Sequence, residues 1–178
     1  MKTCALYGFA IALADSLLIL ALFFLGFHSD PEKLQAAKMI GGLGALAIGI
    51  TFTVLGVKAR RSEVPETEAF GYGSALGAGV LVSLVASVLM AAFNYVYGAF
   101  INPGLSDIII QDQVDRMQAK GISGSQAEQA EKFFRFFMSP GVYAAYMLVV
   151  GFIFAVVLSL IIAAFLKRPE PAAHPTQQ

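Results

Sequence analysis

The chain has 178 residues, of which 57% are hydrophobic and only 13% are charged, and its 12 basic side chains balance its 12 acidic ones. Soluble domains usually have about 45–50% apolar and about 25% charged residues, so the composition argues against a soluble protein. The zero net charge removes the electrostatic argument for a nucleic-acid partner. A single cysteine, Cys4, excludes an intramolecular disulfide and a multi-cysteine metal site.

The first long apolar run covers residues 5–27. It is too long for the apolar segment of a signal peptide, so we interpret it as an uncleaved membrane span. Phe23, Phe24 and Phe27 gather at its far end, as aromatic side chains do at a membrane interface. Asp15 is the one ionisable side chain near the middle of any predicted span.

Two further spans follow after short polar connections. A connection at residues 28–38 leads to the second predicted span, residues 39–57. The next connection packs Lys58, Arg60 and Arg61 into four residues. The third predicted span, residues 70–102, has no charged residue and exceeds the ~20 residues that cross a bilayer. We expect the other helices to be arranged around this third one.

The connection of residues 103–140 is the only substantial aqueous segment. Ser125 and Glu128 form a capping-box pattern, which predicts the start of a helix. Four phenylalanines near its end, beside Lys132 and Arg135, suit a helix that lies on the membrane surface. The same phenylalanines could instead begin the fourth span, at residues 142–166, and the sequence favours neither reading. They are Phe133, Phe134, Phe136 and Phe137.

Every predicted span carries small residues at four-residue spacing, and these fall on one face of a helix. In lipid such a stripe lets two helix backbones approach closely. Since all four spans have one, we expect some stripes to bind other membrane proteins or a second copy. The predicted packing residues are Gly41, Ala45, Gly49, Gly71, Ala75, Gly79, Ser83, Ser87, Gly151, Ala155 and Ser159.

These elements predict an all-α polytopic membrane protein. Its domain, residues 1–168, is an antiparallel bundle of four transmembrane helices with an outer amphipathic helical segment between helices three and four. The tail, residues 169–178, is rich in proline and polar residues, which predicts disorder. Cations beside both termini and at residues 58–61 cluster close to span ends, so we expect both termini to be cytoplasmic.

Asp15 is the candidate functional residue. An aspartate at this depth costs roughly 2.5–3.5 kcal/mol to insert, so it should face the bundle interior or water. No basic residue lies at a similar depth, which leaves a protonated carboxyl or one hydrogen-bonded to a hydroxyl. Such a carboxyl could carry protons or bind a cation, although a packing role is the favoured reading. The candidate hydroxyls belong to Thr51, Thr53, Ser83 and Ser87.

Motifs for catalysis are missing: the sequence has no H-E-x-x-H, G-x-S-x-G or C-x-x-C. His28, Asp30 and Glu32 could form a divalent-ion site, but a solvated loop is the favoured reading, so no metal or cofactor is predicted. The leading hypothesis is a non-enzymatic accessory or scaffold protein. The alternative is a small oligomeric transporter or channel that uses Asp15.

Three stretches together resemble a known family. They are the Phe70-Gly71 entry into the third span, YVYGAFINP from Tyr95, and GISGSQAEQAEKFFRFFMSPG from Gly121, which leads into a span that closes with SLIIAAFLKR. Their order resembles the bacterial membrane family called domain of unknown function 4199. The resemblance implies a four-span protein of the bacterial inner membrane. It implies no activity and no functional residues.

Overall fold

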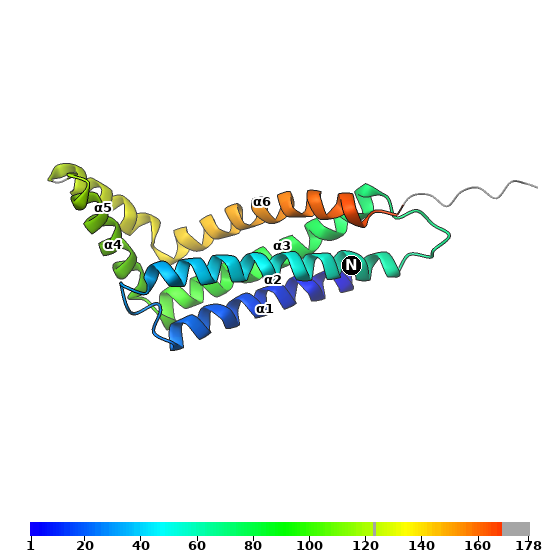
Figure 1. Ribbon diagram of the computed structural model, residues 1–178, viewed down its shortest axis with the longest axis horizontal. Coiled ribbons are helices and arrows are strands. Elements are labelled where there is room, and N and C mark those ends of the chain that lie inside the picture. The colour runs from blue at the N-terminus through cyan, green and yellow to red at the C-terminus, as the bar shows by residue number, and fades with distance from the viewer. Residues whose placement is uncertain (123, 169–178) are drawn as a thin grey trace, which may run out of the picture.

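Four long helices dominate the computed structural model, which describes residues 1–122 and 124–168 (Figure 1). They are α1 (Lys2–Phe24), α2 (Leu34–Ser62), α3 (Tyr72–Val96) with its π-helical extension η1 (Tyr97–Ile101), and α6 (Pro140–Leu166). Each is long and apolar enough to cross a membrane. Each helix exposes large apolar side chains, as expected of helices in lipid; examples are Leu13, Leu43, Leu84 and Ile153. The predicted four-span all-α fold is confirmed.

Helix α3 lies at the centre of the bundle. It packs most extensively against α6 and α1, while α2 packs mainly against α1 and has small contacts with α3 and α6. This arrangement confirms the expectation that the other helices surround the third span.

Small residues make the contacts of α3 close. A methyl group added at Gly79 would lie 2.9 Å from Cβ of Ser159, so α3 and α6 nearly touch there. The hydroxyls of Ser83 and Ser159 are 3.2 Å apart at the same contact. On the α1 side, a methyl group at Gly8 would lie 2.6 Å from the carbonyl oxygen of Val82. The stripes of α1, α3 and α6 are therefore used largely within the chain.

Other small residues do not pack within the chain. Gly71 precedes α3, is exposed, and would meet no atom within 4 Å if it carried a side chain, so the predicted α3 stripe begins only at Ala75. A methyl group at Gly49 or Gly151 would also meet no atom within 4 Å. Ala45 is exposed, whereas Gly41 approaches Leu22.

The bounds of the helices differ from those of the predicted spans, most of all for α2. Helix α2 begins at Leu34 rather than residue 39 and ends at Ser62 rather than residue 57. Helix α1 starts at Lys2 and ends at Phe24, before the predicted residue 27. Apolar composition marks the part of a helix that lies in lipid, whereas backbone hydrogen bonding continues into the polar flanks.

Two shorter helices form an arm that projects from one end of the bundle (Figure 1). The arm comprises α4 (Leu105–Ala119) and α5 (Ser125–Phe137). Arg135 of α5 pairs with Asp107 of α4 at 2.9 Å, and Lys38 of α2 reaches Asp112 of α4 at 3.5 Å. We call this end of the bundle the arm end. The opposite end, where both Met1 and Arg168 lie, is the terminal end.

The phenylalanines near residue 135 belong to α5 and do not begin the fourth span. Helix α5 ends at Phe137, and α6 begins at Pro140. The predicted helix start at Ser125 is confirmed, but the capping box is wrong, because Ser125 is already the first helical residue and Gly124 occupies the cap without a side-chain hydrogen bond. Gly124 has a φ of 65°, a conformation that only glycine adopts readily.

A latch closes the terminal end. The backbones of Phe70 and Arg168 pair through two hydrogen bonds, of 3.2 and 2.8 Å. The Arg168 guanidinium also donates to the carbonyls of Val64, Pro65 and Glu68 in the connection between α2 and α3. We call these contacts the Arg168 latch. They fix the carboxyl end of α6 to that connection.

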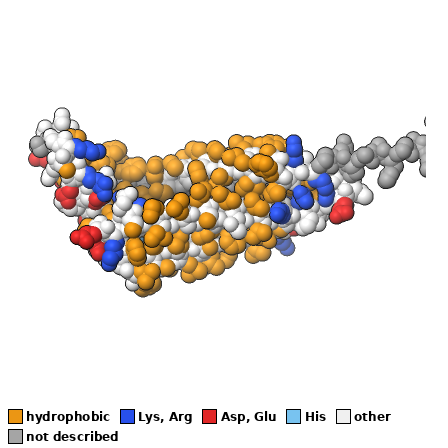
Figure 2. All heavy atoms as spheres, viewed as in Figure 1, with side chains coloured by type: hydrophobic (Ala, Val, Ile, Leu, Met, Phe, Trp, Pro, Cys, Tyr) orange, Lys and Arg blue, Asp and Glu red, His pale blue; other side chains and the backbone are white. Residues whose placement is uncertain are grey.

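The surface separates into zones along the bundle. Figure 2 shows apolar side chains along its length, basic side chains with fewer acidic ones at the terminal end, and acidic and basic side chains together at the arm end. An apolar belt with polar ends is the surface expected of a bundle that spans a bilayer.

Candidate intramembrane binding site

A cleft of 340 Å³ opens in the bundle between α2 and α6. Its floor comes from buried residues of α1 and α3, and its rim includes the exposed residues Gly42 and Ala45 of α2 and Gly151 of α6. Because these rim residues are small, they leave the space between the two helices unfilled. The lining consists of Ile11, Asp15, Gly42, Ala45, Leu46, Gly49, Thr53, Ser83, Ala86, Ser87, Met90, Met147, Gly151, Phe154, Ala155 and Leu158.

Asp15 lies at the floor of this cleft. Its side chain is only 9% exposed, and its Oδ1 atom has no hydrogen-bond partner among the described residues. Leaving a buried polar group unpaired costs about 1–3 kcal/mol, so each such group needs an explanation. It is also the one ionisable side chain among the residues that line the cleft.

Three of the four predicted hydroxyl groups share the cleft with Asp15. Thr53, Ser83 and Ser87 are buried and line it, whereas Thr51 lies on the exposed side of α2. Ser83 donates to the carbonyl of Gly79 at 2.9 Å. Three of the four candidate hydroxyl residues therefore line the same cleft as Asp15, but Oδ1 of Asp15 is not hydrogen-bonded to any of them. A purely structural hydrogen-bonding role for this oxygen has no support from the geometry.

A second pocket, of 220 Å³, lies at the arm end. The Tyr97 hydroxyl stands 2.6 Å from Nδ1 of His28 and 3.2 Å from Nδ2 of Asn102. All three residues line this pocket, together with Lys38 of α2. Tyr97 begins the π-helical turn η1, and such turns occur frequently at functional sites.

The grouping of His28 with Asp30 and Glu32, the less favoured alternative in the sequence, is not found among the described residues. His28 is half-buried and bonds to Tyr97, and burial lowers its pKa from the ordinary value of 6.5. Asp30 instead pairs with Lys33 at 3.2 Å and accepts the backbone N–H of Glu32. Over residues 1–122 and 124–168, no three potential metal ligands gather. Sequence reasoning missed Tyr97 and Asn102 as partners of His28.

The two cavities are stacked along the bundle axis. On each of the four long helices, one residue that lines the cleft lies four positions from a residue that lines the arm-end pocket. Four residues are about one helical turn, or about 6 Å, so a single layer of side chains separates the two spaces. The pairs are Asp15 and Ile19, Gly42 and Lys38, Met90 and Asn94, and Met147 and Tyr143.

The terminal half of the bundle is packed differently. Cys4, Val57 and Phe70 are almost fully buried there, and they belong to one hydrophobic cluster with Ala75 and Val82. The space around Asp15 is therefore next to the arm-end pocket and is separated from the terminal end by this core.

The family of the chain is established by comparison with known families. A family model described as a protein of unknown function (DUF4199) matches residues 6–168. The chain belongs to the DUF4199 family. Neither the curated proteins nor the solved structures contain a match. Membership confirms the resemblance found in the sequence, but DUF4199 supplies no residue roles, so the site is argued from its geometry alone.

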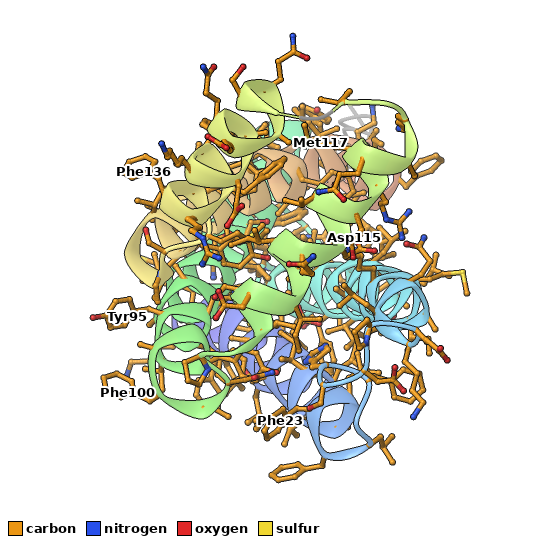
Figure 3. The ribbon with its side chains drawn as sticks, turned by 90° about the vertical axis from the view of Figure 1, so that its left-hand side faces the viewer. Phe23, Tyr95, Phe100, Asp115, Met117 and Phe136 are labelled. Carbon is orange, nitrogen blue, oxygen red and sulfur yellow. The ribbon has the colours of Figure 1, made fainter. Side chains whose placement is uncertain are left out.

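The arm of this DUF4199 protein exposes part of its aromatic cluster. Phe133 and Phe136 are 61% and 67% exposed, while Phe134 and Phe137 are half-buried. Phe137 lies against Tyr146 of α6, with ring centroids 4.8 Å apart. In Figure 3, Phe136 projects to the same side of the arm end as Tyr95 and Phe100. Phe133 and Phe136 are thus free for the membrane contact that the sequence predicts.

Proposed function

We propose that this DUF4199 protein is a small transporter that binds a monovalent cation at Asp15 in exchange for a proton. The observation that carries the proposal is the buried, unpartnered Oδ1 of Asp15, which lines an open cleft. Ionisable groups inside a membrane are costly and usually mark an ion or substrate pathway. The hydroxyls of Thr53 and Ser87, which line the same cleft, add polar character to it.

Because the cleft has a single carboxyl, it can exchange one proton for one monovalent cation. When the cleft is empty, a proton on Asp15 avoids an uncompensated charge in apolar surroundings. When a cation binds, its charge replaces that of the proton. Within residues 1–122 and 124–168, the core around Val57 and Val82 packs the terminal half, so the cleft does not continue to the terminal end. Transport therefore requires that core to rearrange or a second copy to take part, and we include an oligomer in the proposal.

We place the protein in an inner membrane, with both termini in the cytoplasm. Cations close to span ends favour the cytoplasmic side. The terminal end carries Lys2, Lys58, Arg60, Arg61, Lys167 and Arg168. In this orientation the arm and the pocket beside His28 face the other side of the membrane.

Reconstitution into liposomes tests this function. Liposomes with an acidic interior and an entrapped pH-sensitive dye would receive Na⁺, K⁺ or benzyltrimethylammonium outside, one at a time. We expect at least one cation to accelerate proton release, and we expect Asp15→Asn to abolish the effect. Asp115→Asn is the matched control, because Asp115 lies exposed on α4. The proposal fails if no cation acts, or if Asp15→Asn behaves like the wild type.

An accessory or scaffold function remains a second, also non-enzymatic, proposal. The arm supports it, because α4 and α5 project from the bundle with exposed charged and aromatic side chains. Charge reversal at Arg116, Lys120 or Arg135 would then weaken co-purification of a membrane partner. Lys120→Glu is the most informative change, since Arg116 and Arg135 also form ion pairs within the arm. Unchanged co-purification would count against this function.

A further inference from the structure

We infer that the cleft takes an organic monocation with an apolar body, which enters from the lipid between α2 and α6 and places its charge on Asp15. The inference rests on the proposed exchange at Asp15 and specifies its substrate class. It follows from the chemistry of the cleft walls, from the size of the cleft and from the side on which it opens.

The walls suit an organic cation better than a bare inorganic ion. Inorganic ions exchange their water shells for several oxygen ligands. Here one carboxylate and a few hydroxyls are the side-chain oxygens of the lining, and the backbone oxygens of long helices are already hydrogen-bonded. The remaining walls include Met90, Met147 and Phe154. Aromatic faces attract cations, and methionine adapts its shape to varied apolar ligands.

The dimensions agree with a small organic ligand. The cleft volume of 340 Å³ falls within the ~300–1,000 Å³ that is typical of small-molecule sites. Such sites are mostly apolar and contain a few polar groups that orient the ligand. In this cleft Asp15 would be the orienting group, because it is the one ionisable residue of the lining.

The opening faces the apolar flank of the bundle. Gly42, Ala45 and Gly151 on the rim are exposed and carry little or no side chain, so they leave room between α2 and α6 beside the bulkier Leu46 and Phe154. The terminal end is closed by the core around Cys4 and Val57. A cation with an apolar body partitions into lipid and can reach this opening sideways, whereas a hydrated inorganic ion cannot.

Binding must keep the charge balanced. As the cation approaches, the O–H bond of the Asp15 carboxyl breaks, its electron pair stays on the carboxylate, and the proton leaves to water. One proton is therefore released for each monocation bound. Asp15 is the only titratable group that lines the cleft, and the adjacent arm-end pocket is lined by the titratable groups of His28, Lys38, Tyr97 and Tyr143.

Calorimetric titration of the purified protein in detergent tests the inference with benzyltrimethylammonium chloride as the probe. Tetramethylammonium and Na⁺ supply the charge without the apolar body. We expect benzyltrimethylammonium to bind about tenfold or more tightly than either. Titrations in two buffers of different ionisation enthalpy should report about one proton released per cation. These expectations follow from the burial of the apolar body and from charge balance at Asp15.

Variants show whether the probe occupies the cleft. Asp15→Asn should weaken binding about tenfold or more and abolish proton release. Phe154→Leu should weaken binding about two- to fivefold, because it removes an aromatic face but keeps an apolar side chain. Phe165→Leu is the control, since Phe165 lies on the same helix, is 81% exposed and does not line the cleft.

Two results would overturn the inference. One is equal affinity of Asp15→Asn and wild type for benzyltrimethylammonium. The other is binding of Na⁺ or tetramethylammonium that is as tight as binding of the aromatic cation. If Na⁺ or K⁺ drives Asp15-dependent proton release in liposomes while the organic cation does not, the proposed function stands and the substrate class inferred here is wrong.

Discussion

The hydrogen bond between Tyr97 and His28 is compatible with a neutral imidazole, and burial favours that form. The Tyr97 hydroxyl accepts a hydrogen bond from Nδ2 of Asn102, so it is free to donate its own proton to Nδ1 of His28. If Nδ1 of His28 accepts this hydrogen bond, it carries no proton, so the imidazole is neutral. Burial acts in the same direction, because it lowers the pKa of His28 below its ordinary value of 6.5.

This linkage predicts how stability depends on pH. Below about pH 6.5 the unfolded chain protonates His28 while the folded chain resists protonation, so the free energy of unfolding falls as pH drops toward the folded pKa. The thermal midpoint in detergent should therefore be lower at pH 5.5 than at pH 7.5. His28→Gln keeps an acceptor for Tyr97 and should show a smaller difference.

The control for this experiment is His174→Gln, a change at the other histidine of the sequence, outside the described residues. It should leave the pH dependence as in the wild type. If His28→Gln and the wild type lose the same stability between pH 7.5 and 5.5, the neutral imidazole does not contribute.

At the scale of residues, the sequence predicts how deep a side chain lies in the membrane and which face of its helix it occupies. It places Asp15 at mid-bundle and names Ser83, Ser87 and Thr53, which line the same cleft. Thr51 is wrong because residues two apart on a helix point to nearly opposite sides, so Thr51 and Thr53 cannot both face the cleft. The His28–Tyr97 contact is not predictable from spacing, because it joins two helix ends that only the folded bundle brings together.

At the scale of elements, close approach of two helices creates positions that tolerate no side chain. A methyl group at Gly8 would lie 2.6 Å from the Val82 carbonyl oxygen and 2.7 Å from Cβ of Val85. Neither atom can move without shifting α3. We therefore expect Gly8→Ala to lower the free energy of unfolding by about 1–3 kcal/mol, measured by thermal or denaturant unfolding in detergent.

The matched control is Gly77→Ala. Gly77 lies inside α3, and a methyl group there would meet no atom within 4 Å. This change should be neutral or slightly stabilising, because alanine favours the helix over glycine. Equal effects of the two substitutions would mean that the contact between α1 and α3 is not as close as described.

Helix ends were less predictable than helix existence. The pattern at Ser125 and Glu128 predicted a capping box, but Gly124 adopts a positive φ and takes the cap position. Four neighbouring residues cannot reveal how the chain must turn between α4 and α5. The existence of both helices, in contrast, follows from their composition, and both are found.

At the scale of the whole molecule, the predicted orientation can be measured. In a Cys4→Ser background, a cysteine at Lys58 would report on the terminal end and a cysteine at Gln118 on the arm. We expect a membrane-impermeant maleimide to label the Gln118→Cys protein in intact cells and the Lys58→Cys protein only after permeabilisation, because cation clusters favour the cytoplasm. The reverse labelling pattern would mean that both termini lie outside the cytoplasm.

The overall architecture was predictable because lipid imposes it. Long uncharged segments must be helical in a bilayer, and short connections make neighbouring helices antiparallel. Which stripes of small residues pack together was not predictable, since all four helices carry one. The stripe at Gly79 and Ser159 closes a helix contact, whereas Gly49 and Gly151 leave the cleft beside Asp15. Spacing is the same in both cases, and only the fold distinguishes them.

The Arg168 latch fixes one end of α6, so the helix can pivot about that end. It holds the carboxyl end of α6 to the connection before α3, while Gly151 on the cleft rim lies about 22 Å away along the helix. A rigid rod that is pinned at one end moves in proportion to distance from the pin, so a tilt of about 10° would displace the rim by about 4 Å. The contact of Gly79 with Ser159 lies nearer the pin and would move about half as far. Small tilts of α6 would thus change the width of the cleft while the terminal end stays closed.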